Sequence, residues 1–209
     1  LQAQDCDAAL SARARALQKT LIACGLSKYN TGQTAWPIPP KGRRVILVPG
    51  QVENDASVKV GTQGICTNLA LLQDVRRRNP KAYIIYKPHP DVVAGLRRAQ
   101  VQDQQMQALC DQIVTQVDPA VMYAHIDEVH TMTSLLGFEA LIRGVAVTCY
   151  GQPFYAGWGL TTDLSPIDRR TAKLSVEELI AGALIRYPLY LSRHSGRLTT
   201  PEQAIADLT

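Results

Sequence analysis

The chain has 209 residues, of which 46% are apolar and 19% are charged, and its formal net charge is +4. This composition is typical of a globular protein with a sizeable core, and the mild positive charge is too weak to indicate a nucleic-acid-binding surface. The sequence contains no apolar run near the roughly 20 residues that cross a bilayer. It begins with Leu1 rather than Met, so we expect a piece of a longer protein.

The cysteines do not form the pattern of a metal site. No two have the CxxC spacing of a zinc ligand pair, and no histidine lies at ligand spacing from one. We therefore expect buried, reduced thiols and no metal. The residues concerned are Cys6, Cys24, Cys66, Cys110 and Cys149.

The first predicted element is a helix over residues 7–24, followed by an irregular segment over 27–41. Within 7–24, apolar residues recur every three or four positions, as they do on one face of a helix. Glycine and clustered prolines in 27–41 favour a linker.

The central part of the chain alternates between short apolar runs and helical patterns. The runs are continuous, which is typical of strands buried on both faces of a parallel sheet. The predicted strands are 45–48, 83–86, 129–131 and 145–149, and the predicted helices are 67–78, 101–114, 135–142 and 176–185. This order predicts an α/β fold, a Rossmann-like parallel sheet with helices on both faces.

We divide the chain into three parts on this basis. Residues 1–41 form an N-terminal helix and linker, 42–190 form the Rossmann-like domain, and 191–209 form a C-terminal tail. Three arginines, Arg76 to Arg78, end the helix 67–78, where they are well placed against the helix dipole.

The strand 83–86 is followed at once by Lys87, Pro88, His89, Pro90 and Asp91. The prolines hold the backbone extended around His89, because a residue that precedes proline is excluded from the helical region. Ligands of open α/β sheets bind at the carboxyl ends of the strands. Such a polar run is poor core material, so we interpret His89, with Lys87, as part of an anion site.

Three other candidates follow neighbouring strands. Asp55 lies in the loop after 45–48, where it is either a solvated turn carboxylate or a nucleophile or base. Thr133 and Ser134 open a helix, and position alone favours N-capping over phosphate binding. Glu139 lies one helical turn further on and either reaches back to the site or is an exposed helix residue.

Other histidines and the glycines give weaker signals. His125 and His130 fit a packed structural role as well as a functional one. The GxGxxG phosphate fingerprint is absent, so a dinucleotide site is not supported. The segment 151–159, GQPFYAGWG, is a further loop that we expect at the same edge of the sheet.

Four ordered blocks of this sequence resemble the bacterial capsule-polysaccharide β-Kdo transferases. They are VILVPGQVENDAS, NPKAYIIYKPHPDVVAG, DEVHTMTSLLGFEALIRG and VTCYGQPFYAGWGLT, and the resemblance covers about residues 26–190. It implies the donor-binding half of a GT-B glycosyltransferase, with residues 1–41 as a remnant of the acceptor domain.

The resemblance also implies roles for the candidate residues. Asp55 and His89 would be catalytic, and Lys87, Pro90, Thr133, Ser134 and Glu139 would bind the donor, CMP-β-Kdo. No metal or other cofactor is expected, and no DxD pair is present. The acceptor would be a Kdo-bearing lysophosphatidylglycerol glycolipid, at the cytoplasmic face of the inner membrane. Capsule assembly and export proteins are further expected partners, and nucleic acid is not.

Retention of configuration by double displacement would make Asp55 the nucleophile, and His89 would offset charge on the departing phosphate. The sequence leaves open an inverting mechanism with Asp55 as general base. It also leaves open another CMP-sugar transferase of sialyltransferase type, and a non-catalytic nucleotide-binding module of a capsule assembly complex. In the last case a basic surface with Arg97, Arg98, Arg169 and Arg170 would contact a membrane or partner, although we favour the interpretation of these arginines as ordinary solvated surface.

Overall fold

The computed structural model describes residues 1–2, 5–27, 33–91 and 100–209. Its centre is a sheet of six parallel strands in the order β3-β2-β1-β4-β5-β6. The strands are β1 (Val45–Pro49), β2 (Tyr83–Lys87), β3 (Gln112–Ile113), β4 (Glu128–Thr131), β5 (Ala146–Cys149) and β6 (Thr162–Asp163). This is the α/β, Rossmann-like sheet that the sequence predicts.

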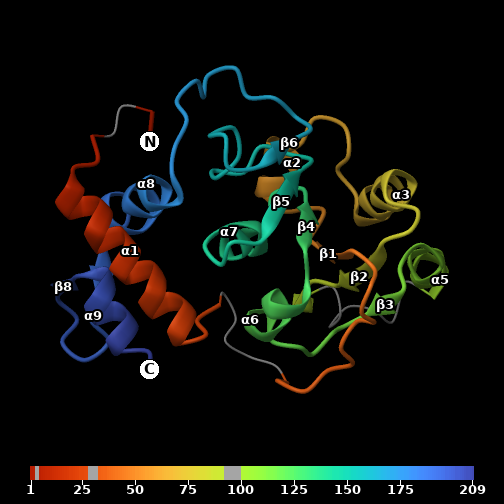
Figure 1. Cartoon of the computed structure of the whole chain (residues 1–209), viewed down its shortest axis with the longest axis horizontal. Helices are drawn as coiled ribbons and strands as arrows, with labels where there is room; N and C mark the ends of the chain where they lie inside the picture. The colour runs from red at the N-terminus through yellow and green to blue at the C-terminus, as the bar shows by residue number, and fades with distance from the viewer. Residues whose placement is uncertain (3–4, 28–32, 92–99) are drawn as a thin grey trace.

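Helices cover both faces of the sheet (Figure 1). On one face, α3 (Asn68–Arg78) and α5 (Gln100–Leu109) pack on the side chains of Ile46, Val48 and Ile84. On the other, α6 (Pro119–Met122), the 3-10 turn η2 (Tyr123–His125) and α7 (Leu135–Leu141) cover Leu47, Ile85 and Val129. Alternate residues of β1 and β2 therefore belong to two separate cores.

The two ends of the chain meet beside this second face, in a layer that we call the α1 layer (Figure 1). Its helices are α1 (Ala8–Ala23), α8 (Val176–Ile180), the π-helical η3 (Ala181–Arg186) and α9 (Pro201–Ala206), and its hairpin pairs β7 (Tyr190–Leu191) with β8 (Leu198–Thr199). Arg13 pairs with Glu202, and Arg15 pairs with Glu177. The predicted parts 1–41 and 191–209 thus pack against each other.

The predicted helices and strands are confirmed, with one boundary wrong. The helix predicted over 101–114 ends at Leu109, because Gln112 and Ile113 pair with Ile85 and Tyr86 as the edge strand β3. The short elements α2 (Ala56–Gly61), α6, β6 and α9 were not predicted, since they span too few residues to show a period.

One other expectation needs correction. Cys24 and Cys66 are exposed, so only part of the thiols fits the buried assignment. In the described part of the chain, no helix is both long and apolar enough to cross a membrane.

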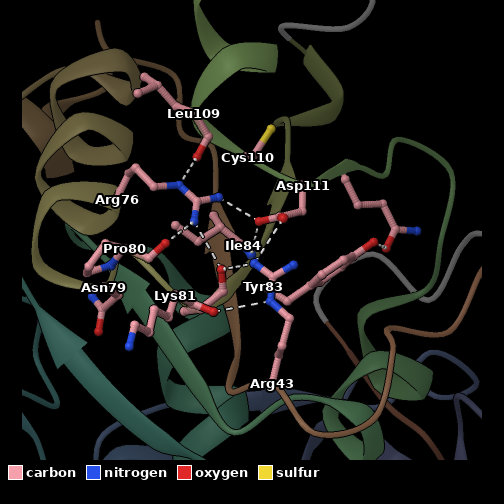
Figure 2. Close-up of polar contacts among 12 residues, drawn as sticks. Arg43, Arg76, Asn79, Pro80, Lys81, Tyr83, Ile84, Leu109, Cys110 and Asp111 are labelled. Atoms are coloured by element: carbon pink, nitrogen blue, oxygen red, sulfur yellow. Dashed lines mark hydrogen bonds and ion pairs between the residues drawn. The ribbon is translucent and has the colours of Figure 1, made fainter.

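Arg76 does more than face the helix dipole, as Figure 2 shows. Its guanidinium donates to the carbonyls of Leu109 and Ala82 at 2.9 and 3.0 Å and to the Asp111 carboxylate at 2.5 Å. Arg43 reaches the same carboxylate at 3.0 Å. The dipole interpretation was therefore incomplete, because Arg76 ties α3 to the segment between α5 and β3.

Asp111 is held as an anion by this arrangement. Burial alone would raise its pKa, but the bond from the Ile84 N–H at 3.0 Å and the two guanidinium groups outweigh that effect and lower the pKa. A carboxyl group whose pKa is lowered on folding contributes stability above its unfolded pKa and loses it as the pH falls through the folded value.

Asp111→Asn should accordingly lower the free energy of unfolding at pH 7 by about 1–3 kcal/mol, the usual loss for hydrogen bonds to charged groups. Urea unfolding would measure it, with the exposed Asp168→Asn as control. The difference should shrink as the pH falls below about 4, where the unfolded carboxyl group takes up its proton. A loss that does not change with pH would contradict the ionic role.

Candidate functional site

The loops that carry the candidate residues leave three adjacent strands at one edge. β1 lies between β2 and β4, and Pro49 at its end is level with Lys87. The Gly50 N–H donates to the Lys87 carbonyl at 2.7 Å. A Cβ at Gly50 would lie 2.6 Å from the Tyr86 hydroxyl and 3.1 Å from the Pro88 Cα, so only glycine lets the loops after β1 and β2 approach this closely.

Gln51 connects the loop after β1 to the loop after β4. Its side-chain Nε2 donates to the Thr133 hydroxyl at 2.8 Å, and its Oε1 accepts from the Thr133 N–H at 2.9 Å and the Thr131 hydroxyl at 3.3 Å. Its main chain exchanges two hydrogen bonds with the Asn68 side chain, at 2.8 and 2.9 Å. Both side chains are buried, so this network fixes three segments at once.

Sequence reasoning missed Gln51 and Asn68. An amide in a loop and an amide at the first turn of a helix are both ordinary solvent-facing residues by pattern. The available signal was position, because Gln51 comes two residues after a buried strand and Asn68 follows the N-cap Thr67.

Asp55 is the N-cap of α2. Its Oδ1 accepts from the Ser57 N–H at 2.7 Å, and the residue is exposed. The turn-carboxylate interpretation therefore describes its local bonding. A capping carboxylate is also favourably placed against the helix dipole, which stabilises its ionised form. Asp55 thus lies at the carboxyl edge of the sheet, in the loop after β1, and β1 is the neighbour of β2.

His89 lies at the adjacent strand end, and 17% of its side chain is exposed. Its Nδ1 accepts from the Asp91 N–H at 3.2 Å, and the Asp91 carboxylate is 3.6 Å away. Acceptance at Nδ1 fits a neutral ring that carries its hydrogen on Nε2. Pro90 and Asp91 have helical backbone, and proline is well tolerated at the first position of a helix because that N–H needs no intrahelical partner.

Lys87 is buried, with 6% exposure, and its Nζ donates to the Thr115 carbonyl at 3.3 Å. Burial lowers the pKa of Lys87, and the charge of Asp118 opposes the shift only in part. In the described ranges no carboxylate forms an ion pair with this ammonium. A cation kept inside the fold at a strand end is a candidate for anion binding.

Thr133 and Ser134 meet the same edge from β4. Ser134 is the N-cap of α7, and its hydroxyl accepts from the Leu136 N–H at 3.2 Å. The Thr133 hydroxyl is bound by Gln51. The N-capping that the sequence position favours is therefore present. Thr133 and Ser134 also lie at the edge of the sheet where we expect the donor phosphate.

Glu139 is buried on the side of α7 that faces α1. Its carboxylate accepts from the Tyr123 hydroxyl at 3.2 Å, and burial followed by the Glu139 charge raises the pKa of Tyr123. It lines an apolar cavity of about 320 Å³ with Leu17 and Leu21 of α1. The expectation of an exposed helix residue is wrong, because Glu139 is 4% exposed.

The loop 151–159 lies at the same edge of the sheet, where Gly151 pairs with Thr62 and the Gln152 N–H donates to the Gly61 carbonyl. Tyr155 is fully buried and donates its hydroxyl to the Ser134 carbonyl at 2.5 Å. Arg170 stacks on Trp158 and donates to the carbonyls of Pro153 and Ala156, so it is not a solvated surface residue. Arg169 is exposed, and Arg97 and Arg98 lie outside the described residues.

His130 is packed, as one of its two interpretations expects, whereas His125 is exposed. His130 Nε2 lies 3.2 Å from Glu128 Oε1, and its Nδ1 lies 3.2 Å from the Tyr150 hydroxyl. His125 makes an edge contact with Trp36. Within the ranges that the structure describes, no group of three His, Cys, Asp or Glu residues could hold a metal ion.

Replacing Gln51 by Leu should destabilise the fold by about 1–3 kcal/mol, because the Thr133 N–H and the Thr131 hydroxyl lose their acceptor in a buried position. Urea unfolding would measure the loss. Gln73→Leu, at an exposed position on α3, is the matched control and should change stability by less than about 0.5 kcal/mol. Equal stability of the two variants would show that the Gln51 network is not structural.

Lys87→Met, unlike Gln51→Leu, should raise the free energy of unfolding at pH 7. A lysine whose pKa is lowered on folding costs stability below its folded pKa, and this cost disappears as the pH rises toward its unfolded value of about 10.4. The variant should therefore unfold at higher urea than the parent at pH 7, with a gain that shrinks toward pH 10. Lys81→Met, exposed before the same strand, is the control. Destabilisation by Lys87→Met would show that the ammonium supports the fold.

The family model for capsule polysaccharide biosynthesis proteins matches residues 9–196. The capsule polysaccharide modification protein LipA of Neisseria meningitidis serogroup B is 52% identical over 188 residues, which are 90% of this chain and 27% of LipA. The lipopolysaccharide-processing protein LpsZ of Rhizobium meliloti is 44% identical over 204 residues, 97% of this chain and 46% of LpsZ. The chain therefore spans less than half the length of these curated relatives.

Two solved structures are also similar, and both are of KpsC from Thermosulfurimonas dismutans. The β Kdo 2,7 transferase has a TM-score of 0.83 and 46% identity over 97% of this chain and 62% of that one. The β Kdo 2,4 transferase has a TM-score of 0.84 and 30% identity over 99% of this chain and 64% of that one. On the match of the family model and of these relatives, the chain belongs to the capsule polysaccharide biosynthesis protein family.

Proposed function

We propose that this chain is the donor-binding and catalytic part of a Kdo transferase that acts in capsule polysaccharide synthesis. The observation that carries the proposal is the 46% identity, at a TM-score of 0.83, to a protein named as a β Kdo 2,7 transferase. The site supports it independently, because Asp55, His89 and Thr133 follow three adjacent strands at one edge of the sheet.

The proposed donor is CMP-β-Kdo, and the proposed acceptor is a Kdo-bearing lysophosphatidylglycerol glycolipid at the cytoplasmic face of the inner membrane. A cytidylate phosphate would meet Thr133 and Ser134, at the start of α7, and the His89 ring. Lys87, buried at the end of β2, would contribute positive electrostatic potential from inside the fold. The chemistry needs no metal, because a phosphate that leaves as an anion is offset by these groups.

In the proposed mechanism the Asp55 carboxylate attacks the anomeric carbon of the sugar, and the bond to the CMP phosphate breaks with its electron pair on the phosphate. The acceptor hydroxyl then attacks the anomeric carbon, the bond to Asp55 breaks with its electron pair on the carboxylate, and the hydroxyl proton passes to water, so that two inversions give net retention. The N–H of Ser57, which donates to Oδ1 of Asp55, holds the carboxylate in one orientation. Glu139 as a ribose ligand remains a prediction, and its carboxylate also accepts from the Tyr123 hydroxyl.

Asp55→Asn separates catalysis from folding. Asparagine caps a helix about as well as aspartate, so α2 should persist and stability should change by less than about 0.5 kcal/mol. Release of CMP from CMP-β-Kdo should nevertheless fall by about 10³-fold or more, because the attacking carboxylate is gone. His89→Ala should reduce turnover by about 10²-fold. Asn54→Ala, at the preceding exposed position, is the control and should keep the parental rate.

Titration with CMP by calorimetry tests the donor site apart from turnover, and the Asp55→Asn variant should bind CMP like the parent. Parental rates in Asp55→Asn would reject the assignment. Turnover of CMP-sialic acid in preference to CMP-Kdo would indicate a sialyltransferase-like enzyme. CMP binding without turnover of either donor, together with an unaffected Asp55→Asn variant in capsule synthesis, would indicate a non-catalytic module.

A further inference from the structure

Two carboxylates lie two residues apart in the loop after β1, and their surroundings differ. Glu53 is partly buried, and its Oε1 accepts from the main-chain N–H of Asn68 at 2.7 Å. Asp55 is exposed, and its Oδ1 accepts from the Ser57 N–H at the start of α2. By residue type the two side chains are equivalent candidates for the chemistry, whereas their contacts separate them.

The partner of Glu53 is the first turn of α3. Asn68 is the first residue of this 11-residue helix, and the N-cap Thr67 accepts from the Ala70 N–H at 3.2 Å. The N–H groups of a first helical turn have no partner within the helix, and the helix dipole favours an anion beside them. The Glu53 carboxylate therefore binds one of these N–H groups, and the Thr67 hydroxyl binds another.

Asn68 also holds the main chain of Gln51. Its side chain accepts from the Gln51 N–H at 2.8 Å and donates to the Gln51 carbonyl at 2.9 Å. Asn68 therefore binds the loop after β1 at two places, at position 51 through its side chain and at position 53 through its own N–H. The second of these places lies two residues before Asp55.

A tight turn connects Glu53 to Asp55. The Asp55 N–H donates to the Val52 carbonyl at 2.9 Å, so that Glu53 and Asn54 are the two central residues of a β-turn. The Asp55 carbonyl in turn accepts from the Val58 N–H at 3.1 Å, in the first turn of α2. Because the turn is this short, fixing Glu53 also fixes the direction in which the Asp55 side chain leaves the main chain.

We propose that Glu53 is a positioning residue, which holds the turn that presents the Asp55 carboxylate to the sugar. The inference rests on the proposed function, since Glu53 acts through the proposed nucleophile. It gives the two carboxylates separate roles, because Glu53 is bound at the start of α3 and Asp55 is exposed at the edge of the sheet. A reacting group that is misplaced by about 1 Å can cost about 10²-fold in rate.

Release of CMP from CMP-β-Kdo by the 209-residue chain tests the proposal, with kcat and KM measured separately. Glu53→Ala removes the acceptor of the Asn68 N–H and should lower kcat by about 10- to 100-fold. KM for the donor and Kd for CMP should change by less than about twofold, because the donor-binding groups are untouched. Glu53→Gln keeps an acceptor oxygen and should retain kcat within about threefold.

Val75→Ala is the control for lost stability, because Val75 is fully buried further along the same helix. It should lower the urea midpoint at least as much as Glu53→Ala does, since it removes core contacts, and it should keep the parental kcat.

Amide hydrogen exchange followed by NMR tests the positioning without turnover. The N–H groups of Asp55 and Ser57 donate to the Val52 carbonyl and to the Asp55 carboxylate. Glu53→Ala should speed up their exchange by at least about fivefold, because the turn opens more often. Glu53→Gln and Val75→Ala should leave it unchanged.

Parental kcat in Glu53→Ala would overturn the proposal. An equal loss of kcat in Glu53→Gln would also overturn it, because the charge of Glu53 would then take part in the chemistry. An equal loss in Val75→Ala, or unchanged exchange at Asp55 and Ser57 in Glu53→Ala, would leave Glu53 with a structural role alone. No CMP release by the parent would reject the proposed function, and the exchange rates would still decide whether Glu53 fixes the turn.

Discussion

The candidate site depends on the hydrogen bonds between the Gln51 side chain and Thr133. Parallel strands have crossovers that bring all their outgoing loops to one edge, but topology alone does not fix the distance between two loops. Gln51 fixes it, because one amide group binds both the N–H and the hydroxyl of Thr133 while its main chain is held by Asn68. The glycine at position 50 has the corresponding role toward β2, where a side chain would collide with Tyr86.

The sheet carries two buried ionisable side chains with different surroundings, Glu128 in β4 and Lys87 in β2. Burial would raise the pKa of Glu128, but the adjacent His130 ring and the bonds from Thr148 and Arg44 lower it, so this carboxylate has polar partners inside the fold. Lys87 has a lowered pKa and a single carbonyl partner among the described residues. The partners of Glu128 are consistent with a role in stability. Lys87 lacks such partners and lies at a strand end, which makes it a candidate for binding an anionic ligand.

The sequence was sufficient for the sheet and for the placement of Asp55 and His89, because continuous apolar runs mark buried strands and chain order then determines which loops share an edge. It was not sufficient for Gln51, Arg76 or Glu139. Their roles depend on partners 82, 35 and 16 residues away in the chain, at Thr133, Asp111 and Tyr123, and no local pattern encodes such partners. The short edge strand β3 was hidden for the same reason, since only its pairing with β2 defines it.

The position of Asp55, the proposed nucleophile, depends on contacts between the short helix α2 and other loops. Six residues are too few for a helix to be stable in isolation, so its position must come from contacts at its ends. Asp55 caps the first turn, while Gly61 at the last turn lies against the Thr133 methyl group and accepts from the Gln152 N–H at 2.7 Å. The orientation of the Asp55 carboxylate is thereby set by the loops after β4 and β5. A change in either loop would move the carboxylate relative to His89 without touching either residue.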